Sequence, residues 1–411
     1  MPARDLTTED LAAYRRLTAE AFGGVPSEVP APFSPAQIPI GIDAAVVPGD
    51  ERTMLAAGAC IRRDEIALGG GTASCGGIGG LAVHPAHRGV GLFSELIDAA
   101  LGRCAAEGMA FSMLYPSNPA IYRRHGYQLI ARTHAIVLPL GELQRVARVP
   151  GRRTVAVTEH TMPRLRALYE ELTAGDNGML RRRGPLFPEG LPAAPWGAIL
   201  LQDDEGRDRG YLSFSRISPG SDGAGLEVHE VLGRDREDLL ALLHHLGSWS
   251  TVTYAARLRL RTEDPVLDLL PGGGLRTPDD IVPLVMMRLV DTARALRARP
   301  APEHCRGTLD LWVEDTTPAA ASCRAAGGWR VDVHDGAIEV EQLDPDAAPA
   351  SLEGSLGRVE LDVHAAALLL SGGRSLADAR RLGLRAESDP PAERLLDAVL
   401  AGPRPSVMDA F

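Results

Sequence analysis

The segment 81–93, LAVHPAHRGVGLF, constrains the fold of this chain more than any other part of the sequence. The apolar run Leu81–Val83 predicts a buried strand, and the run Arg88–Gly91 predicts a tight turn. From Leu92 onward, apolar residues recur on one face of a helix. The predicted order is therefore strand, glycine turn and helix. The free amides of such a turn and the positive end of the helix make a site for a phosphate or pyrophosphate group.

This turn differs from two other phosphate-binding loops. It lacks the lysine of a P-loop, since the chain contains no lysine at all, and its spacing is not GxGxxG. The order Arg88-x-x-Gly91 resembles the pyrophosphate loop of the GNAT acyltransferases, Arg/Gln-x-x-Gly-x-Gly/Ala. Phe93 stands where Gly or Ala is usual. An ordinary strand-to-helix turn is the alternative interpretation of the same residues.

Length and composition bound the remaining possibilities. A chain of 411 residues, 45% of them hydrophobic, predicts two or three domains with full cores. No apolar stretch approaches the roughly 20 residues of a membrane helix, and the N-terminus has no apolar signal region. Five scattered cysteines do not indicate a disulfide framework. We therefore expect a cytoplasmic protein without a membrane span.

The charge of the chain points away from nucleic acid. A formal net charge of −11 opposes binding to phosphate backbones and suits the attraction of polycations. The histidines lack the HExxH pattern and the cysteines lack paired spacing, so no metal site is expected. No Gly-x-Ser-x-Gly motif supports a hydrolase triad.

The first predicted domain covers residues 1–147. Its order of elements matches one GNAT domain. The elements expected are a helix at about 5–23, strands at about 43–48, 53–62 and 73–84, the glycine turn and its helix, a strand near 110–114, a short helix near 118–125, and a strand-like run over 127–138.

The second predicted domain covers residues 148–283 and repeats that order in outline. Its expected elements are a helix at 162–172, a hairpin of 196–201 and 209–217, a strand at 226–232 and a helix at 236–246. Three carboxylates, those of Asp235, Glu237 and Asp238, stand where a pyrophosphate would dock. Acidic residues suit a helix start, but they repel phosphate. This domain is therefore expected to be GNAT-like without a cofactor.

The third predicted domain covers residues 284–411 and has an α+β pattern. A helix is expected from about Val285 to Pro300, followed by strands at 307–314 and 329–333. Asp335-Gly336 predicts a hairpin turn into a strand at 337–343. Two further helices are expected at 364–370 and 392–401.

The segment 115–127, YPSNPAIYRRHGY, carries the remaining chemistry. In the GNAT pattern it follows the strand that diverges from the cofactor strand. Ser117 and Asn118 would then cap a short helix and face the cofactor, and Tyr122 would point at the thioester sulfur. The leaving thiolate needs a proton, which a phenol of pKa about 10 can donate. A half-buried core aromatic is the alternative for Tyr122, and Tyr127 is expected in the core.

The whole chain resembles the enhanced-intracellular-survival (Eis) aminoglycoside N-acetyltransferases. The segment 121–127 fits the family motif Ile-Tyr-x-Arg-x-Gly-Tyr, whose Tyr is the proton donor. The chain ends in Phe411, as in that family, where the terminal carboxylate enters the active site. The run Met287–Asp291 agrees with the start of the family's third domain.

The resemblance implies a fold class, a cofactor and an assembly. The implied fold combines α/β and α+β parts: two tandem GNAT-like domains, the second without cofactor, and a C-terminal sterol-carrier-protein-like domain. The implied co-substrate is acetyl-CoA, and the implied assembly is a homohexamer built as a trimer of dimers. The loop at 24–39 offers only Glu28 and Phe33 as candidates for the acceptor pocket.

The resemblance also assigns site residues. Backbone pairing with the pantetheine arm falls to Leu81, Ala82 and Val83. The pyrophosphate would be held by Arg88, Gly89, Val90, Gly91, Leu92, Phe93 and Ser94. Ser117 and Asn118 would line the thioester end, and Tyr122 and Phe411 would be catalytic.

The sequence thus predicts an acetyl-CoA-dependent N-acetyltransferase that acts by direct transfer on amines of aminoglycoside-like polycations. Two alternatives stay open. The acceptor could be a lysine of a protein or peptide. The chain could instead be a non-catalytic ligand-binding or regulatory protein that uses its C-terminal domain.

Overall fold

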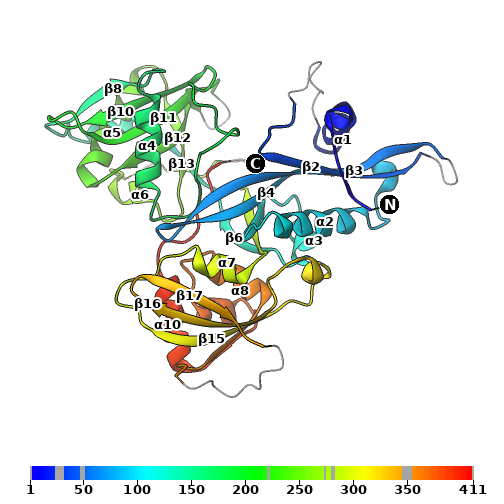
Figure 1. The fold of residues 1–411 in the computed structure, drawn as a ribbon. Helices are drawn as coiled ribbons and strands as arrows, with labels where there is room; N and C mark the ends of the chain where they lie inside the picture. The colour runs from blue at the N-terminus through cyan, green and yellow to red at the C-terminus, as the bar shows by residue number, and fades with distance from the viewer. Residues whose placement is uncertain are drawn as a thin grey trace. The chain divides into compact units, whose positions relative to one another are not determined.

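The computed structural model describes residues 2–23, 32–46, 51–219, 223–272, 275–278, 283–344 and 354–409. They form a mixed α/β fold with three sheets (Figure 1). The chain divides into two compact units. The first unit combines the N-terminal part of the chain, up to Ile130, with Leu284–Pro405. The middle unit combines Ala131–Pro283 with Ser406–Asp409.

The N-terminal part of the first unit has the expected order of its main helices and strands, but two bounds differ. The first helix begins at Leu11 and not near residue 5, and the strand expected at about 43–48 begins at Gln37 and ends at Ala45. Its elements are β1 (Arg4–Asp5), η1 (Thr8–Asp10), α1 (Leu11–Phe22), β2 (Gln37–Ala45), β3 (Thr53–Leu68), β4 (Gly71–Val83), η2 (Pro85–His87), α2 (Leu92–Ala106), β5 (Phe111–Leu114), α3 (Pro119–Arg123) and β6 (Gln128–Arg132). The strand expected over 127–138 is two strands, because the chain leaves this sheet after β6 and β7 (His134–Pro139) joins another.

The sheet of the first unit follows the order β1-β2-β3-β4-β5-β14-β6. β4 and β5 run parallel, and α2 is the crossover between them. The buried face of α2 packs on this sheet. That face consists of Leu96, Ile97, Ala100, Leu101 and Cys104, and its partners in the core include Ile40, Ile61 and Ile78.

The prediction of one helix from Val285 to Pro300 is wrong. Leu284–Leu289 is a strand, β14, which pairs antiparallel with β5, and α7 (Thr292–Arg297) follows it. A short apolar run does not distinguish a buried strand from a buried helix. The signal that marks the boundary is Asp291, whose side chain accepts the amide of Arg294 at 2.9 Å and so caps α7.

β14 contributes one partner of a buried ion pair in the first unit. The side chains of Arg288 and Asp315 are both fully buried and pair with each other. Arg288 also donates to the carbonyl oxygen of Leu289 at 2.9 Å. Gly126 passes over this guanidinium with φ +82°, and a Cβ there would lie 2.7 Å from Nε of Arg288. The glycine of the 121–127 segment is therefore required by a close approach.

The C-terminal part of the first unit is a sheet covered by helices, in agreement with an α+β pattern. Its order is β17-β16-β15-β18-β19. The elements are β15 (Gly307–Glu314), η5 (Pro318–Ser322), β16 (Gly327–His334), β17 (Ala337–Gln342), β18 (Arg358–Asp362), α8 (Val363–Leu370), α9 (Leu376–Arg381), β19 (Ala386–Ser388) and α10 (Pro390–Leu400). The predicted hairpin turn is present, since Asp335 and Gly336 both have positive φ, 47° and 78°.

The middle unit is a second mixed sheet of order β7-β13-β12-β11-β10-β8. Its elements besides β7 are η3 (Leu140–Arg145), β8 (Arg153–Ala156), α4 (Met162–Leu172), β9 (Asn177–Leu180), β10 (Trp196–Gln202), β11 (Asp208–Arg216), β12 (Ala224–Gly233), α5 (Arg236–Gly247), η4 (Ser248–Thr251), β13 (Ala255–Leu260) and α6 (Val266–Leu269). β12 and β13 are parallel with α5 between them, as β4 and β5 are with α2.

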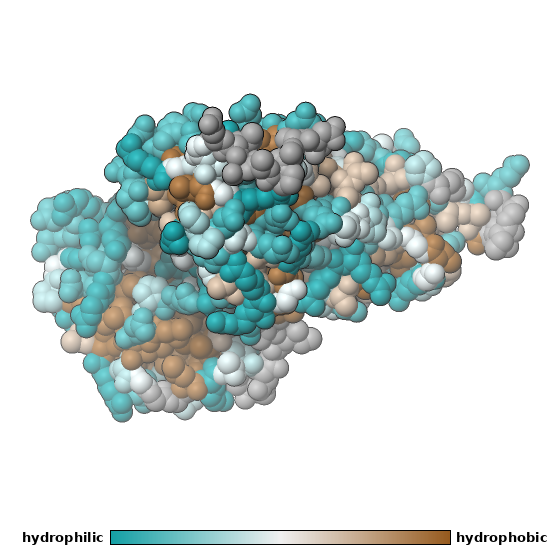
Figure 2. All heavy atoms as spheres, turned by 90° about the horizontal axis from the view of Figure 1, so that it is seen from below, coloured by the Kyte–Doolittle hydropathy of each residue, from teal (hydrophilic) through white to brown (hydrophobic). Residues whose placement is uncertain are grey.

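On the face drawn in Figure 2, hydrophilic side chains cover most of the area and apolar side chains gather in smaller patches. Among the described residues, none of the helices combines the length and the apolarity that a membrane crossing requires.

Candidate active site

The candidate site begins where β4 and β5 separate. The two strands pair only from Cys75 to Gly77, opposite Phe111 to Met113. β4 continues to Val83, while β5 ends at Leu114. Within the described residues, no strand covers the freed edge of β4 beyond Gly77. An extended ligand arm can therefore bond to backbone groups there, as an added strand would.

A bulge reshapes β4 at this edge. Cys60 pairs with Gly79 and Gly58 with Ala82, so two residues of β4, Gly80 and Leu81, face one residue of β3. Gly80 has φ +59°, and the hydroxyl of Tyr14 donates to its carbonyl oxygen at 3.1 Å. A Cβ on Gly80 would lie 2.2 Å from that hydroxyl. Bulges of this kind re-aim backbone groups beside active sites.

The glycine turn lies after β4, at the start of α2. Gly89 and Gly91 have φ values of +79° and +95°, and a Cβ at either would meet no atom within 4 Å. Among the described residues, the backbone N–H groups of residues 89–94 meet no hydrogen-bond acceptor, and no side chain caps α2. The turn thus offers open space, unpaired amides and a helix start, which is what an anionic group needs.

The predicted pyrophosphate residues all lie in this turn or in the first turn of α2. Val90 is 70% exposed, and Arg88 is exposed with its Nε 3.4 Å from the carbonyl oxygen of Val83. Leu92, Phe93 and Ser94 are half-buried. The predicted pantetheine residues Leu81, Ala82 and Val83 form the last part of β4 beside the bulge.

The buried phenol of Tyr122 lies next to this turn. Its ring contacts the ring of Phe93 edge-on, with 5.3 Å between the centroids. Tyr122 is 6% exposed. Burial raises the pKa of Tyr122 above its ordinary value of 10, and a hydrogen bond with Ser117 partly opposes this shift. The phenol therefore keeps its proton at neutral pH and can act as a proton donor.

Of the two residues predicted to cap α3, only Asn118 does so, and Ser117 contacts Tyr122 instead. The side chain of Asn118 accepts the amide of Ala120 at 3.0 Å and caps α3. Ser117 contacts the phenol and does not cap the helix. The hydroxyl of Tyr127 is 2.7 Å from that of Ser112, and Tyr127 is fully buried, so it belongs to the core as predicted.

Two pairs of residues were not predicted from the sequence. One is Tyr14 with Gly80, which shapes the bulge; the Gly79-Gly80 pair inside a strand pattern is the signal that could have indicated it. The other is His125 with Asp98, whose side chains are 2.7 Å apart. No local pattern connects those two residues, because they come from different elements.

Of the three other predicted residues, the structure describes only Phe33. Glu28 and Phe411 lie outside the described residues. Phe33 packs against Tyr14, with 5.7 Å between the ring centroids. Within the described ranges, His, Cys, Asp and Glu residues form no group of three or more that could hold a metal ion.

The corresponding turn of the middle unit is filled by its own carboxylates. Asp235 accepts the amide of Asp238 at 2.9 Å and caps α5. Asp238 is fully buried, with Arg152 at 2.7 Å, and Arg209 lies 2.6 Å from Asp235. Burial opposes ionisation of Asp235, but the amide of Asp238 and the guanidinium of Arg209 lower its pKa. Anionic groups already stand at this helix start, and the arginines beside it are paired.

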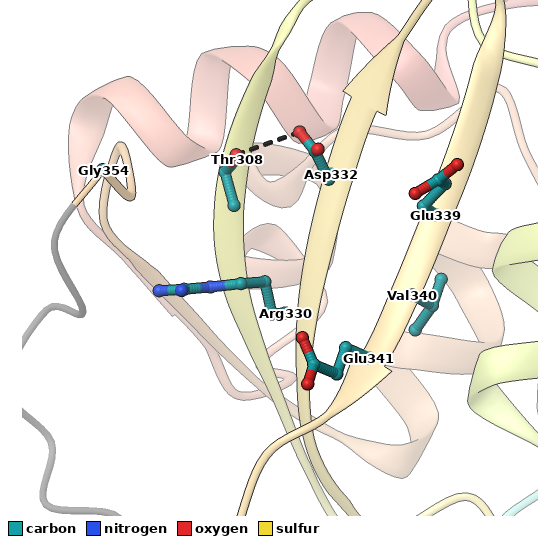
Figure 3. A pocket seen from close by; sticks show the side chains of 7 residues that line it. All are labelled: Thr308, Arg330, Asp332, Glu339, Val340, Glu341 and Gly354. Carbon is teal, nitrogen blue, oxygen red and sulfur yellow. Dashed lines mark hydrogen bonds between the residues drawn. The ribbon is translucent and has the colours of Figure 1, made fainter.

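A separate hollow of about 290 Å³ lies on the C-terminal sheet (Figure 3). Charged and polar side chains dominate its lining, including Arg330, Glu339 and Glu341. The hydroxyl of Thr308 donates to Asp332 at 3.0 Å within it. This lining does not favour an apolar ligand.

Residues 2–130 match the family model of the acetyltransferase (GNAT) domain. No curated protein matches the sequence. Several solved structures share the fold over the full length. A GCN5-related N-acetyltransferase from Kribbella flavida has a TM-score of 0.78 at 24% identity, covering 100% of this chain and 98% of that one. Its counterpart from Anabaena variabilis has a TM-score of 0.81 at 19% identity, covering 100% and 99%.

Eis1 from Mycobacterium abscessus has a TM-score of 0.68 at 21% identity, and the match covers 100% of both chains. At these identities the likeness establishes the fold alone. The domain match is the finding that bears on chemistry. Residues 2–130 match the GNAT acetyltransferase domain, and GNAT domains use acetyl-CoA.

The open turn generates a first prediction. Gly91→Glu should abolish acetyl-CoA binding without unfolding the chain, because its carboxylate would oppose the phosphates in the space where they bind. Calorimetric titration measures the binding, and circular dichroism checks the fold. Gly91→Gln is the matched control, since it has the same shape and the same backbone strain of about 1–3 kcal/mol without the charge. Unchanged acetyl-CoA binding in a folded Glu variant would refute the role of this turn.

The filled turn of the middle unit generates a second prediction. Titration should give one CoA per chain, because Asp235 and Asp238 repel a phosphate at the start of α5. The Gly91→Glu chain should bind none, which assigns the single site to the first turn. A stoichiometry of two in the unmodified chain would mean that the middle unit binds cofactor after all.

Proposed function

Because residues 2–130 form a GNAT acetyltransferase domain, we propose that this chain transfers the acetyl group of acetyl-CoA directly to an amine of an aminoglycoside-like polycation. The observation that carries the proposal is the contact between Phe93 and Tyr122. This contact brings together the glycine turn, whose amides suit phosphates, and the protonated phenol of Tyr122. The net charge of −11 favours a polycationic acceptor.

The proposed cofactor residues act as a clamp. The amides of Gly89–Ser94 hold the pyrophosphate, with Arg88 beside them. Leu81–Val83 offer backbone groups to the pantetheine arm, and Ser117 and Asn118 lie at the thioester end. When bound, acetyl-CoA supplies the activated acyl carbon. The protein then contributes orientation and proton transfer.

Proton transfer is assigned to two groups. The amine nitrogen forms a bond to the acyl carbon and the carbon–sulfur bond breaks. Tyr122 donates its proton to the leaving sulfur. The terminal carboxylate of Phe411 accepts the proton that the amine loses, directly or through a water molecule. No acyl-enzyme forms in this scheme.

The larger organisation is part of the same proposal. We assign residues 1–147 and 148–283 to tandem GNAT-like domains and 284–411 to a sterol-carrier-protein-like domain. The shared β-α-β arrangement of β4, α2, β5 and β12, α5, β13 supports the tandem assignment. A cytoplasmic homohexamer, as in the Eis family, is the proposed form. The polar hollow of the C-terminal sheet weighs against a protein that only binds an apolar ligand.

Tyr122→Phe tests the proton donor. The variant keeps the ring contact with Phe93 and loses only the hydroxyl, so turnover should fall by a factor on the order of 10²–10⁴. Acetyl-CoA affinity should barely change. Turnover is read from free thiol released in the presence of a polyamine acceptor. Tyr127→Phe is the matched control, because its hydroxyl bonds Ser112 in the core. Near-normal turnover in Tyr122→Phe would show that this residue is a core aromatic and not the proton donor.

The end of the chain tests the proton acceptor. The preceding tail is anchored: Asp409 lies 3.0 Å from Arg182, the amide of Ser406 donates to Asn177 at 2.8 Å, and Val407 and Met408 are buried. Deleting Phe411, or adding one or two residues after it, should cripple turnover while CoA still binds. An N-terminal tag should be harmless. If a chain with a C-terminal tag turns over normally, a different base must act.

A further inference from the structure

Three side chains beside the glycine turn form a continuous hydrogen-bonded chain. Oγ of Ser94 lies 3.1 Å from Nε2 of His125, and Nδ1 of His125 lies 2.7 Å from Oδ1 of Asp98. His125 is 3% exposed, whereas Asp98 is 26% exposed. Ser94 and Asp98 are one helical turn apart on α2, so they present their side chains to the same neighbour.

His125 also connects the two elements of the candidate site. Its amide donates to the carbonyl oxygen of Tyr122 at 2.9 Å, directly after α3. Its ring lies edge-on to Phe93 with 6.0 Å between the centroids. His125 occupies an unspecified position of the Ile-Tyr-x-Arg-x-Gly-Tyr motif, so this contact belongs to the present chain and does not follow from the motif.

The protonation of His125 decides what Ser94 can offer a ligand. An ionised Asp98 only accepts hydrogen bonds, so it takes the Nδ1–H of His125. With neutral imidazole, Nε2 carries no hydrogen, and the hydroxyl of Ser94 must donate to it. The hydroxyl hydrogen of Ser94 is then not available to a ligand. With imidazolium, Nε2–H donates to Oγ, and the hydroxyl hydrogen of Ser94 becomes free to donate to a ligand.

A pyrophosphate at the turn distinguishes these two states. Its oxygens accept hydrogen bonds and repel lone pairs, and its charge attracts a nearby cation. Ser94 is the third residue of α2, within the turn whose amides are unpaired. We propose that binding of the pyrophosphate group is coupled to uptake of one proton by His125, relayed through Ser94 and supported by Asp98. This inference rests on the proposed placement of acetyl-CoA at the turn.

The charged groups around the ring are compatible with this coupling. Asp98 of α2 is the carboxylate that pairs with it. Cys323, after η5, interacts electrostatically with Asp98, and burial raises the pKa of that thiol, so it stays neutral. Arg123 and Arg124 of the same turn are exposed to solvent.

A serine, a histidine and an aspartate in this order also recur in nucleophilic triads. Ser94 belongs to the turn assigned to the phosphates, whereas the proposed proton donor for sulfur, Tyr122, bonds Ser117. A nucleophile would have to meet the acyl carbon, which the proposal places beside Tyr122. We therefore assign Ser94 to phosphate binding and not to acyl transfer.

Calorimetry in buffers of different ionisation enthalpy measures the proton uptake directly. Dephospho-CoA is the probe because it keeps the pyrophosphate but lacks the phosphate monoester of CoA. That monoester has a second pKa near 6, so it would exchange protons of its own. The unmodified chain should take up between zero and one proton on binding at pH 7.5. Its affinity for dephospho-CoA should fall by up to about tenfold per unit of rising pH.

Variants separate the relay from simple attraction. His125→Gln replaces the ring with an amide that can donate to Ser94 without titrating, so it should bind dephospho-CoA with no proton uptake and a flat pH profile. Ser94→Ala keeps His125 and removes the relay, and it should also lose the uptake. His87→Gln removes a neighbouring histidine outside the chain of bonds and should change nothing. Circular dichroism confirms the fold of each variant.

Three results would overturn the inference. Binding by the unmodified chain without proton uptake contradicts the coupling and leaves the proposed function intact. Full uptake in Ser94→Ala shows that the coupling acts through space and not through the hydroxyl. If the unmodified chain binds neither acetyl-CoA nor dephospho-CoA, the site itself is contradicted, and the proposed function is contradicted as well.

Discussion

The short parallel pairing of β4 with β5 is the constraint on which the rest of the site depends. The strands stay together only from Cys75 to Gly77 on the β4 side. β5 then runs into Tyr115-Pro116, and a proline cannot continue the ladder because it has no backbone N–H. β4 bends at the bulge near Gly80. The two strands therefore part, and among the described residues one edge of β4 beyond Gly77 has no neighbouring strand.

The crossover geometry places the other parts of the site around that opening. A parallel pair requires a crossover, and here α2 provides it, so its start lies just past the end of β4. The chain leaving β5 folds into α3 and delivers Tyr122 to Phe93 at the start of α2. A ligand arm at β4, phosphates at the turn and a phenol at α3 are thus consequences of one topology.

The sheet of the first unit is completed from far along the chain. β14 covers the edge of β5 that β4 does not. Its residue Met286, and Val290 directly after the strand, belong to the same core as α2. In the middle unit β13 is covered in the same way by β7, which precedes the rest of that unit. The sheet that carries the candidate site therefore requires the segment after Pro283 for its own core.

Much of this could be predicted from the sequence, since its signals are local. The glycine turn, α2 and the cap of α3 depend on neighbouring residues. In the middle unit, the acidic residues Asp235 and Asp238 indicate that the turn before α5 already holds carboxylates. β14 could not be predicted, because a short apolar run fits strand and helix equally. The bond between Ser94 and His125 could not either, because it needs the packing of α3 on α2. The role of Phe411 stays a prediction, since this residue lies outside the described residues.

Hydrogen exchange of backbone amides with and without acetyl-CoA shows whether the glycine turn and the freed edge of β4 bind this ligand. Exchange slows where amides gain hydrogen bonds or lose solvent. We expect slower exchange with acetyl-CoA at residues 89–94 and along the freed edge of β4 at residues 79–83, with no change at the start of α5. Unchanged exchange at the glycine turn, or protection at residues 235–238 of the middle unit, would contradict this expectation.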